Sequence, residues 1–400
     1  MASGVLRASL WCVLATLVWA GNVNPVLSSA PAVGSNVACK DIEGKRPSCT
    51  GNCPASCPQQ CLIFCPGCQT FCRPDQVRPA VRPAAIFIFG DGNLDVGNSN
   101  ILASGDYDIP HDEQQTLYPQ WVGTDGDNIA QFIAKFMGFQ GSPPAYLTLP
   151  RSIHVGKGFT GVNYACAGAG LRDLDPNMDG WLTITMSKQL QQFAATRAQM
   201  EAKLGGAQAV KVFLAKSFFL IEVGGVDLTH YLPYPYGPTE VRDLLALYEG
   251  KIKSLHSMGA RRFGLINVGL IGNLRSLGGG YDVADMNKHA AEFNRGLKTL
   301  LAGLAKTLPG LHYSIADLYT FTQTVFANPS DYGFEDIQTP CSEYYGDSSQ
   351  PHCDNPAKHW FWDEYGYITE HAANLVATTF FYGPPQFTAP VIFRSLLDVK

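Results

Sequence analysis

Short apolar runs alternate with longer amphipathic segments from about residue 84 onward. The run at residues 85–89 is continuous and rich in Ile and Phe, which is typical of a strand buried on both faces of a parallel sheet. Similar runs predict strands over 217–223, 262–268 and 312–315. Helical periodicity predicts helices over 128–137, 188–204, 240–257, 285–304 and 369–379. The alternation indicates an α/β fold with a mostly parallel sheet.

The N-terminus differs from this pattern. Arg7 precedes an apolar run over residues 10–20, and small residues follow it. This arrangement is typical of a secretory signal peptide, which we expect to be residues 1–20, with cleavage between about residues 20 and 30. A membrane anchor is the alternative, but the run is too short to span a bilayer comfortably. We therefore expect a secreted, extracellular chain.

Residues 39–72 form a cysteine-rich module. Because Pro54, Pro58 and Pro66 each follow a cysteine directly, a helix with aligned thiols is disfavoured. An even number of cysteines in an exported chain favours a compact, disulfide-stapled module, whose pairing the sequence cannot give; a metal cluster is the less favoured alternative. Residues 73–83 resemble a Pro/Arg linker into a main domain at 84–400. The cysteines of the module are Cys39, Cys49, Cys53, Cys57, Cys61, Cys65, Cys68 and Cys72.

Composition narrows the classes of partner. The net charge is −5, 46% of the residues are hydrophobic, and no basic run is present, so a nucleic-acid partner is not expected. Beyond the N-terminal run no stretch of eighteen apolar residues occurs, so no membrane span is expected in the mature chain. We expect neither a cofactor nor a metal ion.

The run at 85–89 leads into a turn rich in Gly, Asp and Asn, where a parallel strand would present polar groups to a ligand. This stretch resembles the first block of the plant GDSL esterase/lipases, which belong to the SGNH-hydrolase superfamily. In that family the strand ends in Phe-Gly-Asp-Ser, and the Ser is the nucleophile. Here Gly92 stands at the position of that Ser. The matching residues are Phe89, Gly90, Asp91, Asp95, Gly97 and Asn98.

Further blocks follow in the family's order, from 84 to about 382. Residues 161–170 resemble the second block, in which Gly168 matches a glycine whose backbone N–H group serves the oxyanion hole. Residues 224–227 resemble Gly-Gly-Asn-Asp, 259–263 and 328–334 resemble two connecting stretches, and 361–366 resemble Phe-Trp-Asp-x-x-His. The resemblance implies an SGNH-hydrolase-like, three-layer α/β/α sandwich around a mostly parallel sheet.

Three side chains that the family's chemistry needs are absent. Gly92 replaces the nucleophile, Val226 replaces the Asn of the oxyanion hole, and Gly366 replaces the His that acts as the base. Asp363, which would orient that His, remains. The resemblance therefore implies a catalytically degenerate hydrolase, a pseudoenzyme. Because two of the losses are to Gly, we also expect an open, enlarged cleft above Gly92.

Two residues are candidate substitutes. Cys166 lies in the second block, but a nucleophilic thiol needs a lowered pKa, and a buried, inert thiol is the favoured interpretation. His371 follows Asp363 by a few residues, and a surface helix position is favoured for it. Asp91 is expected to hold its turn, although Asp91 and Asp363 are also candidates for activating water.

Given the resemblance, Cys341 and Cys353 are expected to form a disulfide around a polar loop. Three functional hypotheses remain. In the first, a non-catalytic protein of the plant apoplast or cell wall binds an acyl ester, a lipid, an acylated sugar or a wall component. In the second, displaced residues make an active carboxylic-ester hydrolase. In the third, the cysteine-rich module acts in extracellular recognition. The oligomeric state stays open.

Overall fold

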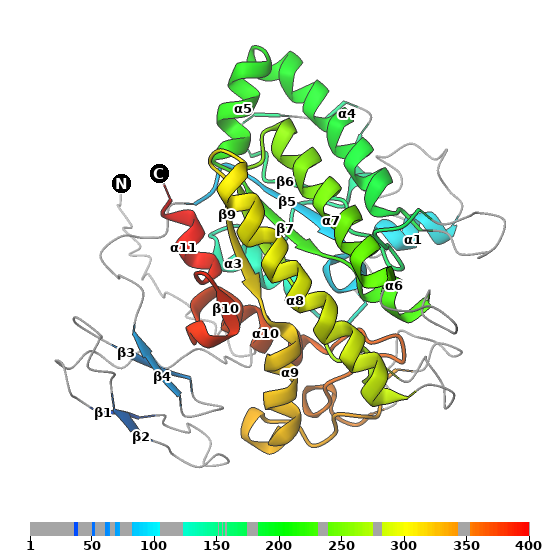
Figure 1. Cartoon of the computed structure of the whole chain (residues 1–400), viewed down its shortest axis with the longest axis vertical. Helices are drawn as coiled ribbons and strands as arrows, with labels where there is room; N and C mark the ends of the chain where they lie inside the picture. The colour runs from blue at the N-terminus through cyan, green and yellow to red at the C-terminus, as the bar shows by residue number, and fades with distance from the viewer. Residues whose placement is uncertain are drawn as a thin grey trace, which may run out of the picture.

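The structure is a computed structural model of the 400-residue chain, shown in Figure 1. Its main body is a six-stranded sheet with helices on both faces. The described residues are 36–38, 50–52, 61–64, 69–72, 82–104, 123–150, 152–153, 155–156, 158–173, 183–230, 239–274, 282–342 and 353–399.

The large sheet has the strand order β10-β9-β8-β7-β5-β6. Neighbouring strands are parallel from β9 to β6, whereas β10 pairs with β9 in the antiparallel direction. In register, Ile86 of β5 lies between Gly161 of β6 and Phe218 of β7. The strands are β5 (Ile86–Gly90), β6 (Gly161–Asn163), β7 (Phe218–Glu222), β8 (Arg262–Ile266), β9 (His312–Ala316) and β10 (Thr388–Ala389).

The side chains of β5 alternate between two apolar cores, one on each face of the sheet. Phe87 and Phe89 belong to one core, where the ring of Phe87 lies 5.3 Å from that of Phe219 in a stacked arrangement. Ile86 and Ile88 belong to the other core. A strand that is buried on both faces needs apolar residues at every position, which explains the continuous run.

Helices cover each core and complete a three-layer sandwich (Figure 1). The core of Phe87 is covered by α4 (Met186–Leu204), α5 (Ala207–Ala215), α7 (Thr239–Met258) and α8 (Val283–Thr307). The core of Ile86 is covered by α3 (Ile129–Phe136), α9 (Leu318–Ala327), α10 (Glu370–Tyr382) and α11 (Phe393–Leu397). Two short helices, α1 (Asn98–Ser104) and α6 (Gly225–His230), follow β5 and β7.

The structure confirms the α/β/α architecture and every strand and helix that the sequence predicts, with shifts of a few residues at their ends. The sequence analysis missed the helices α1, α5, α6, α9 and α11, and the short strands β6 and β10 of the large sheet. β6 and β10 have only three and two residues, too few to show a periodicity. The segment 105–122 lies outside the described residues.

Within and beside the cysteine-rich module the structure describes four short strands. β1 (Asn36–Ala38) pairs with β2 (Thr50–Asn52), and β3 (Cys61–Phe64) pairs with β4 (Gln69–Cys72), both antiparallel. In the second pair Cys61 lies opposite Cys72 in register. The other six cysteines of the module, the expected signal peptide and nearly all of the expected linker lie outside the described residues. The domain boundaries therefore remain predictions.

Cys341 and Cys353 form the disulfide that the family resemblance implied, with a Cα–Cα distance of 4.9 Å and a sequence separation of 12.

A disulfide that closes a loop of this length stabilises a protein by about 2–3 kcal/mol, because it restricts the unfolded state. We expect a variant with both cysteines changed to alanine to lose about that free energy of unfolding. Urea denaturation would measure the loss, and an unchanged midpoint would contradict it.

No helix among the described residues is long and apolar enough to cross a membrane.

Candidate functional site

The carboxyl ends of β6, β5 and β7 lie side by side, because β5 is the middle strand of the three. Asp91 and Gly92 follow β5, Gly168 follows β6, and Val226 lies in α6, shortly after β7. The structure therefore brings these predicted positions to one edge of the sheet. In parallel α/β sheets this is the edge at which ligands bind.

The end of β5 is held from α4 by the side-chain amide of Gln189. The Gly90 N–H group donates to Gln189 Oε1 over 2.9 Å, and Gln189 Nε2 donates back to the Gly90 carbonyl over 2.8 Å. Gln189 is fully buried, so its amide is satisfied by these bonds and by the Ile184 carbonyl. The turn that carries Asp91 and Gly92 thus starts from a rigid point.

Asp95 has a structural role in this turn. Its Oδ1 accepts from the Gly97 and Asn98 N–H groups, at 2.8 Å each. Its Oδ2 accepts from the N–H groups of Ser99 and Ala167 and from the Ser99 hydroxyl. This carboxylate ties the start of α1 to the segment after β6. Since so many donors already surround it, Asp95 is poorly suited to act as a base.

The position of the family's nucleophile is filled by Tyr367. A β-carbon added at Gly92 would lie 2.0 Å from Cε1 and 2.1 Å from the phenol oxygen of Tyr367. The same ring also lies close to Gly123, where an added β-carbon would lie 2.8 Å from Cδ1 of Tyr367. The ring therefore occupies the space that a serine side chain would need. The expectation of an open, enlarged cleft above Gly92 is wrong at this point, because an aromatic ring has replaced the lost atoms.

Tyr367 is held by a tight hairpin that precedes α10. The Trp362 N–H group donates to the Tyr367 carbonyl over 2.7 Å, and Phe361 lies opposite Ile368 in an antiparallel bridge. Asp363 Oδ1 accepts from the N–H groups of Tyr365 and Tyr367, over 3.0 and 3.1 Å. Asp363 therefore closes this turn. Burial raises its pKa from 3.8 to about 7.

Gly366 lies in the same hairpin with φ of +96°, in the left-handed region that L-residues rarely adopt. A β-carbon there would lie 2.4 Å from Cδ2 of Leu274. With the same backbone, the β-carbon of a His at this position would clash with Leu274, and the positive φ would strain the turn. The backbone conformation of this hairpin therefore accommodates Gly at position 366 and not the His that acts as the family's base.

The third block keeps its Asp in a structural role. Asp227 of α6 accepts from the Leu171 N–H group over 2.7 Å and from the Arg172 N–H group over 3.0 Å. Burial raises its pKa above the ordinary value. The neighbouring Val226 is partly exposed and has only an isopropyl group, so it offers no hydrogen-bond donor from its side chain.

The two candidate substitutes are placed differently. Cys166 is fully buried, its Sγ lies 3.6 Å from Ser99 Oγ, and burial raises its pKa to about 12. A neutral, enclosed thiol is the opposite of an activated nucleophile. His371, at the start of α10, has Nε2 at 3.0 Å from the Tyr332 carbonyl and packs its ring 4.9 Å from that of Phe334. These contacts favour the inert interpretation for both residues.

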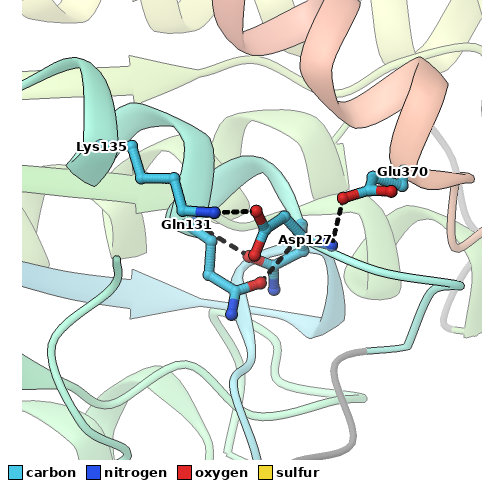
Figure 2. Close-up of polar contacts among 5 residues, drawn as sticks. Asp127, Gln131, Lys135 and Glu370 are labelled. Atoms are coloured by element: carbon cyan, nitrogen blue, oxygen red, sulfur yellow. Dashed lines mark hydrogen bonds and ion pairs between the residues drawn. The ribbon is translucent and has the colours of Figure 1, made fainter. Parts of the chain in front are cut away.

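The start of α10 is fixed against the start of α3 by a polar cluster, shown in Figure 2. The Asp127 N–H group donates to Glu370 Oε1 over 3.1 Å, and Lys135 forms an ion pair with Asp127. Asn128 and Gln131 exchange hydrogen bonds as a capping box at the start of α3. Because Glu370 comes shortly after Tyr367, this cluster also fixes the end of the Tyr367 hairpin.

Sequence reasoning missed two residues at this edge, the buried Glu222 and the half-buried Tyr367. Glu222 ends the apolar strand β7 and is only 6% exposed, and it accepts from Asn93 Nδ2 over 3.0 Å. A charged residue at the end of a fully apolar run was the signal that could have found it. No pattern in the sequence marks Tyr367.

Burial changes the protonation of the acids here. It raises the pKa of Asp91 from 3.8 to about 7, a rise to which the Asp227 carboxylate contributes. Burial, with Asp91 as its neighbour, raises the pKa of Glu222 well above 4.5. Burial raises the pKa of the Tyr367 phenol well above 10, and the charges of Asp363, Asp95 and Asp91 raise it too. Tyr367 is therefore a neutral phenol and not a nucleophilic phenolate.

One group of side chains in the described part of the chain has metal-ligand spacing, namely Cys341, Cys353 and His359. The two cysteines form the disulfide, so they offer no thiolates to an ion. This group does not fit a metal ion.

Comparison with known proteins supports the resemblance over most of the chain. Three GDSL esterase/lipases of Arabidopsis thaliana are similar to it. The first is 29% identical over 340 residues, covering 78% of this chain and 89% of the relative. The second is 28% identical, covering 79% and 91%, and the third is 30% identical, covering 73% and 84%.

Among solved structures, the lipase Lip_vut3 from goat rumen metagenome matches 75% of this chain and 98% of its own, at 12% identity and a TM-score of 0.34. Likeness at that level adds nothing to the assignment. The model of the family described as GDSL-like Lipase/Acylhydrolase matches residues 86–377, which is well over half of the sequence. The chain belongs to the GDSL-like lipase/acylhydrolase family.

Proposed function

We propose that this protein is a secreted, non-hydrolytic member of its family, which acts by binding a ligand and not by cleaving an ester. One observation carries the proposal: the Tyr367 ring fills the space beside Gly92 in which the nucleophile's side chain would stand. An alignment slip could explain a missing serine. It would not explain an aromatic ring packed into the serine's place.

The chemical argument concerns three separate roles. Hydrolysis by a serine enzyme needs an attacking hydroxyl, a base that takes its proton, and donors for the developing oxyanion. Gly92, Gly366 and Val226 supply none of these from their side chains. Loss of the nucleophile or the base alone costs on the order of 10⁶ in turnover, and loss of one oxyanion donor costs about 10² to 10³.

The ligand class comes from the relatives, whose names describe esterases and lipases. We infer that the ligand is an acyl ester, a lipid or an acylated sugar, or a cell-wall component that carries such groups. Since Tyr367 fills the position beside Gly92, the ligand does not reach the depth of a family nucleophile. Secretion rests on the N-terminal segment, where charge, apolar length and small flanking residues are those of a signal peptide.

The first test is hydrolysis of p-nitrophenyl butyrate by the purified protein, together with labelling by a fluorophosphonate, which reacts with activated serines. We expect no p-nitrophenol release above the buffer rate and no labelled residue by mass spectrometry. The physical reason is the missing nucleophile. A Cys166→Ala variant and a His371→Ala variant serve as matched controls and should behave like the wild type.

Turnover that follows the protein through purification and disappears in either control variant would overturn the proposal in favour of a displaced active site. Labelling of Ser99 would do the same. Binding is tested separately by calorimetric titration with a medium-chain ester, with recovery of the ester measured by chromatography. Saturable binding with intact ester supports the proposal, whereas absence of binding to esters and lipids counts against this ligand class.

A further inference from the structure

Three buried polar atoms without a hydrogen-bond partner among the described residues lie on groups that interact with one another at the end of β5 and β7. They are Asp91 Oδ1, Glu222 Oε2 and the Tyr248 phenol oxygen. Burial raises the pKa of Glu222 and of Tyr248 in α7; in addition, the charge of Asp91 raises the pKa of Glu222, and the charge of Glu222 raises that of Tyr248. The strands place the two acids together, because Gly90 pairs with Glu222 and the Asp91 N–H group donates to the Glu222 carbonyl over 3.0 Å.

The donors around Glu222 are too few for a buried carboxylate. Asn93 Nδ2 donates to Oε1, while Oε2 has no partner among the described residues. Asp95, a few residues away in the sequence, shows the contrast, since its two oxygens accept five hydrogen bonds. A buried charge with one donor and an acidic neighbour is strongly disfavoured, whereas a neutral carboxylic acid can donate to a carboxylate beside it.

We propose that Asp91 and Glu222 form an acid pair that holds one proton at neutral pH, and that release of this proton in alkaline solution weakens the strand ends beneath Tyr367. The pair goes beyond the proposed binding function, which does not require it. The pair lies beside a packed contact, because Asp91 adjoins Gly92, against which the Tyr367 ring packs, and a second negative charge would arise next to it.

The groups that act on the pair from the neighbouring elements are acidic, phenolic or neutral. They are Asp227 of α6, Tyr248 of α7, Tyr367 of the hairpin and Asn93 after β5. None of these supplies a positive charge that would favour ionisation of both acids. Because no cation among these groups balances the charge of the two carboxylates, the pair is neutralised by binding a proton.

The sign of the pH dependence follows from linkage. The folded protein binds this proton more tightly than the unfolded chain does, because the pKa of Asp91 rises from 3.8 to about 7 on folding and that of Glu222 also rises. The stability that this proton contributes is therefore fully present below about pH 4 and is lost as the pH rises toward and beyond 7. Asp95, Asp227 and Asp363 shift in the same direction and add to this loss.

The experiment separates the pair from those other acids by substitution. In Glu222→Gln the amide oxygen can still accept from Asn93, but no proton can be held. We expect the wild-type Tm to fall by roughly 5 °C between pH 5 and pH 8, and the variant to lose at least half of that fall. At pH 8 the variant should melt above the wild type. Asp331→Asn, at an exposed acid, is the matched control and should keep the wild-type profile.

A spectroscopic readout tests the proton itself. At pH 7 in D₂O, the infrared difference between wild type and Glu222→Gln should contain the carbonyl stretch of a neutral carboxylic acid. Equal pH profiles of the wild type and Glu222→Gln, or absence of that band, would overturn the proposal. If Glu222→Gln does not fold, Asp91→Asn replaces it in both measurements with the same expected flattening.

Discussion

Changing Gly92 to alanine is expected to lower the free energy of unfolding by about 1–3 kcal/mol, the usual cost of overpacking a filled site. The reason is steric, since the new β-carbon would overlap the ring and phenol oxygen of Tyr367. The backbone at Gly92 lies outside the left-handed region, so alanine can adopt it. Most other Gly-to-Ala changes that a backbone tolerates stabilise a protein slightly, which makes a loss here diagnostic.

A double-mutant cycle tests the cause. Tyr367→Ala alone should cost about 2–4 kcal/mol, because it removes a packed aromatic ring. In that background Gly92→Ala should cost little, giving a coupling energy of about 1–2 kcal/mol by urea denaturation. Additive losses in the double variant would show that the two residues do not compete for the same space. The same result would remove the observation on which the proposed function rests.

The largest single loss is expected for Gly90→Ala. A β-carbon at Gly90 would lie 1.9 Å from the Glu222 carbonyl oxygen of the neighbouring strand, and the backbone there has φ of +134°. Because the obstacle is backbone within a sheet, no side chain can move aside. We expect a loss of at least about 3 kcal/mol, or failure to fold, from the sum of strain and clash.

Two glycines serve as controls for this prediction. Gly97 has φ of +127° with nothing near its missing β-carbon, so Gly97→Ala should show the conformational strain alone, about 1–2 kcal/mol. Gly141 has open space and no left-handed φ, so its change to alanine should be neutral or slightly stabilising. Denaturation midpoints of the three variants would be compared. Equal losses at Gly90 and Gly97 would contradict the argument from close strand approach.

The sheet could be predicted from sequence because its strands carry their own signal. Residues 85–89 are apolar at every position, and Phe87 and Ile88 are fully buried on opposite faces. Block matches placed Gly92 and Val226 after the predicted strands 85–89 and 217–223, whereas the strand before Gly168, β6, was not predicted. Predicting these strands and the residues that follow them requires only the local pattern and the order along the chain. For this reason the predicted strands agree with the structure.

The content of the site could not be predicted in the same way. The absent side chains at Gly92 and Gly366 suggested extra space, but whether space remains depends on what packs there. Tyr367 reaches Gly92 because a hairpin closed by Asp363 points it across to another segment. Glu222 and Asp91 interact because two strands with distant sequence positions are neighbours. Such contacts arise from tertiary packing, which a local sequence pattern does not predict.

The central position of β5 has a consequence for biosynthesis. In the six-stranded sheet, β5 is the first strand to leave the ribosome, and it pairs with β6 and β7, which are made later. The Gln189 amide that holds Gly90 follows it by 99 residues. At ordinary elongation rates of about 5–20 residues per second, an Ile- and Phe-rich segment waits on the order of ten seconds for its partners. During that interval it is an aggregation-prone segment that a chaperone would need to shield.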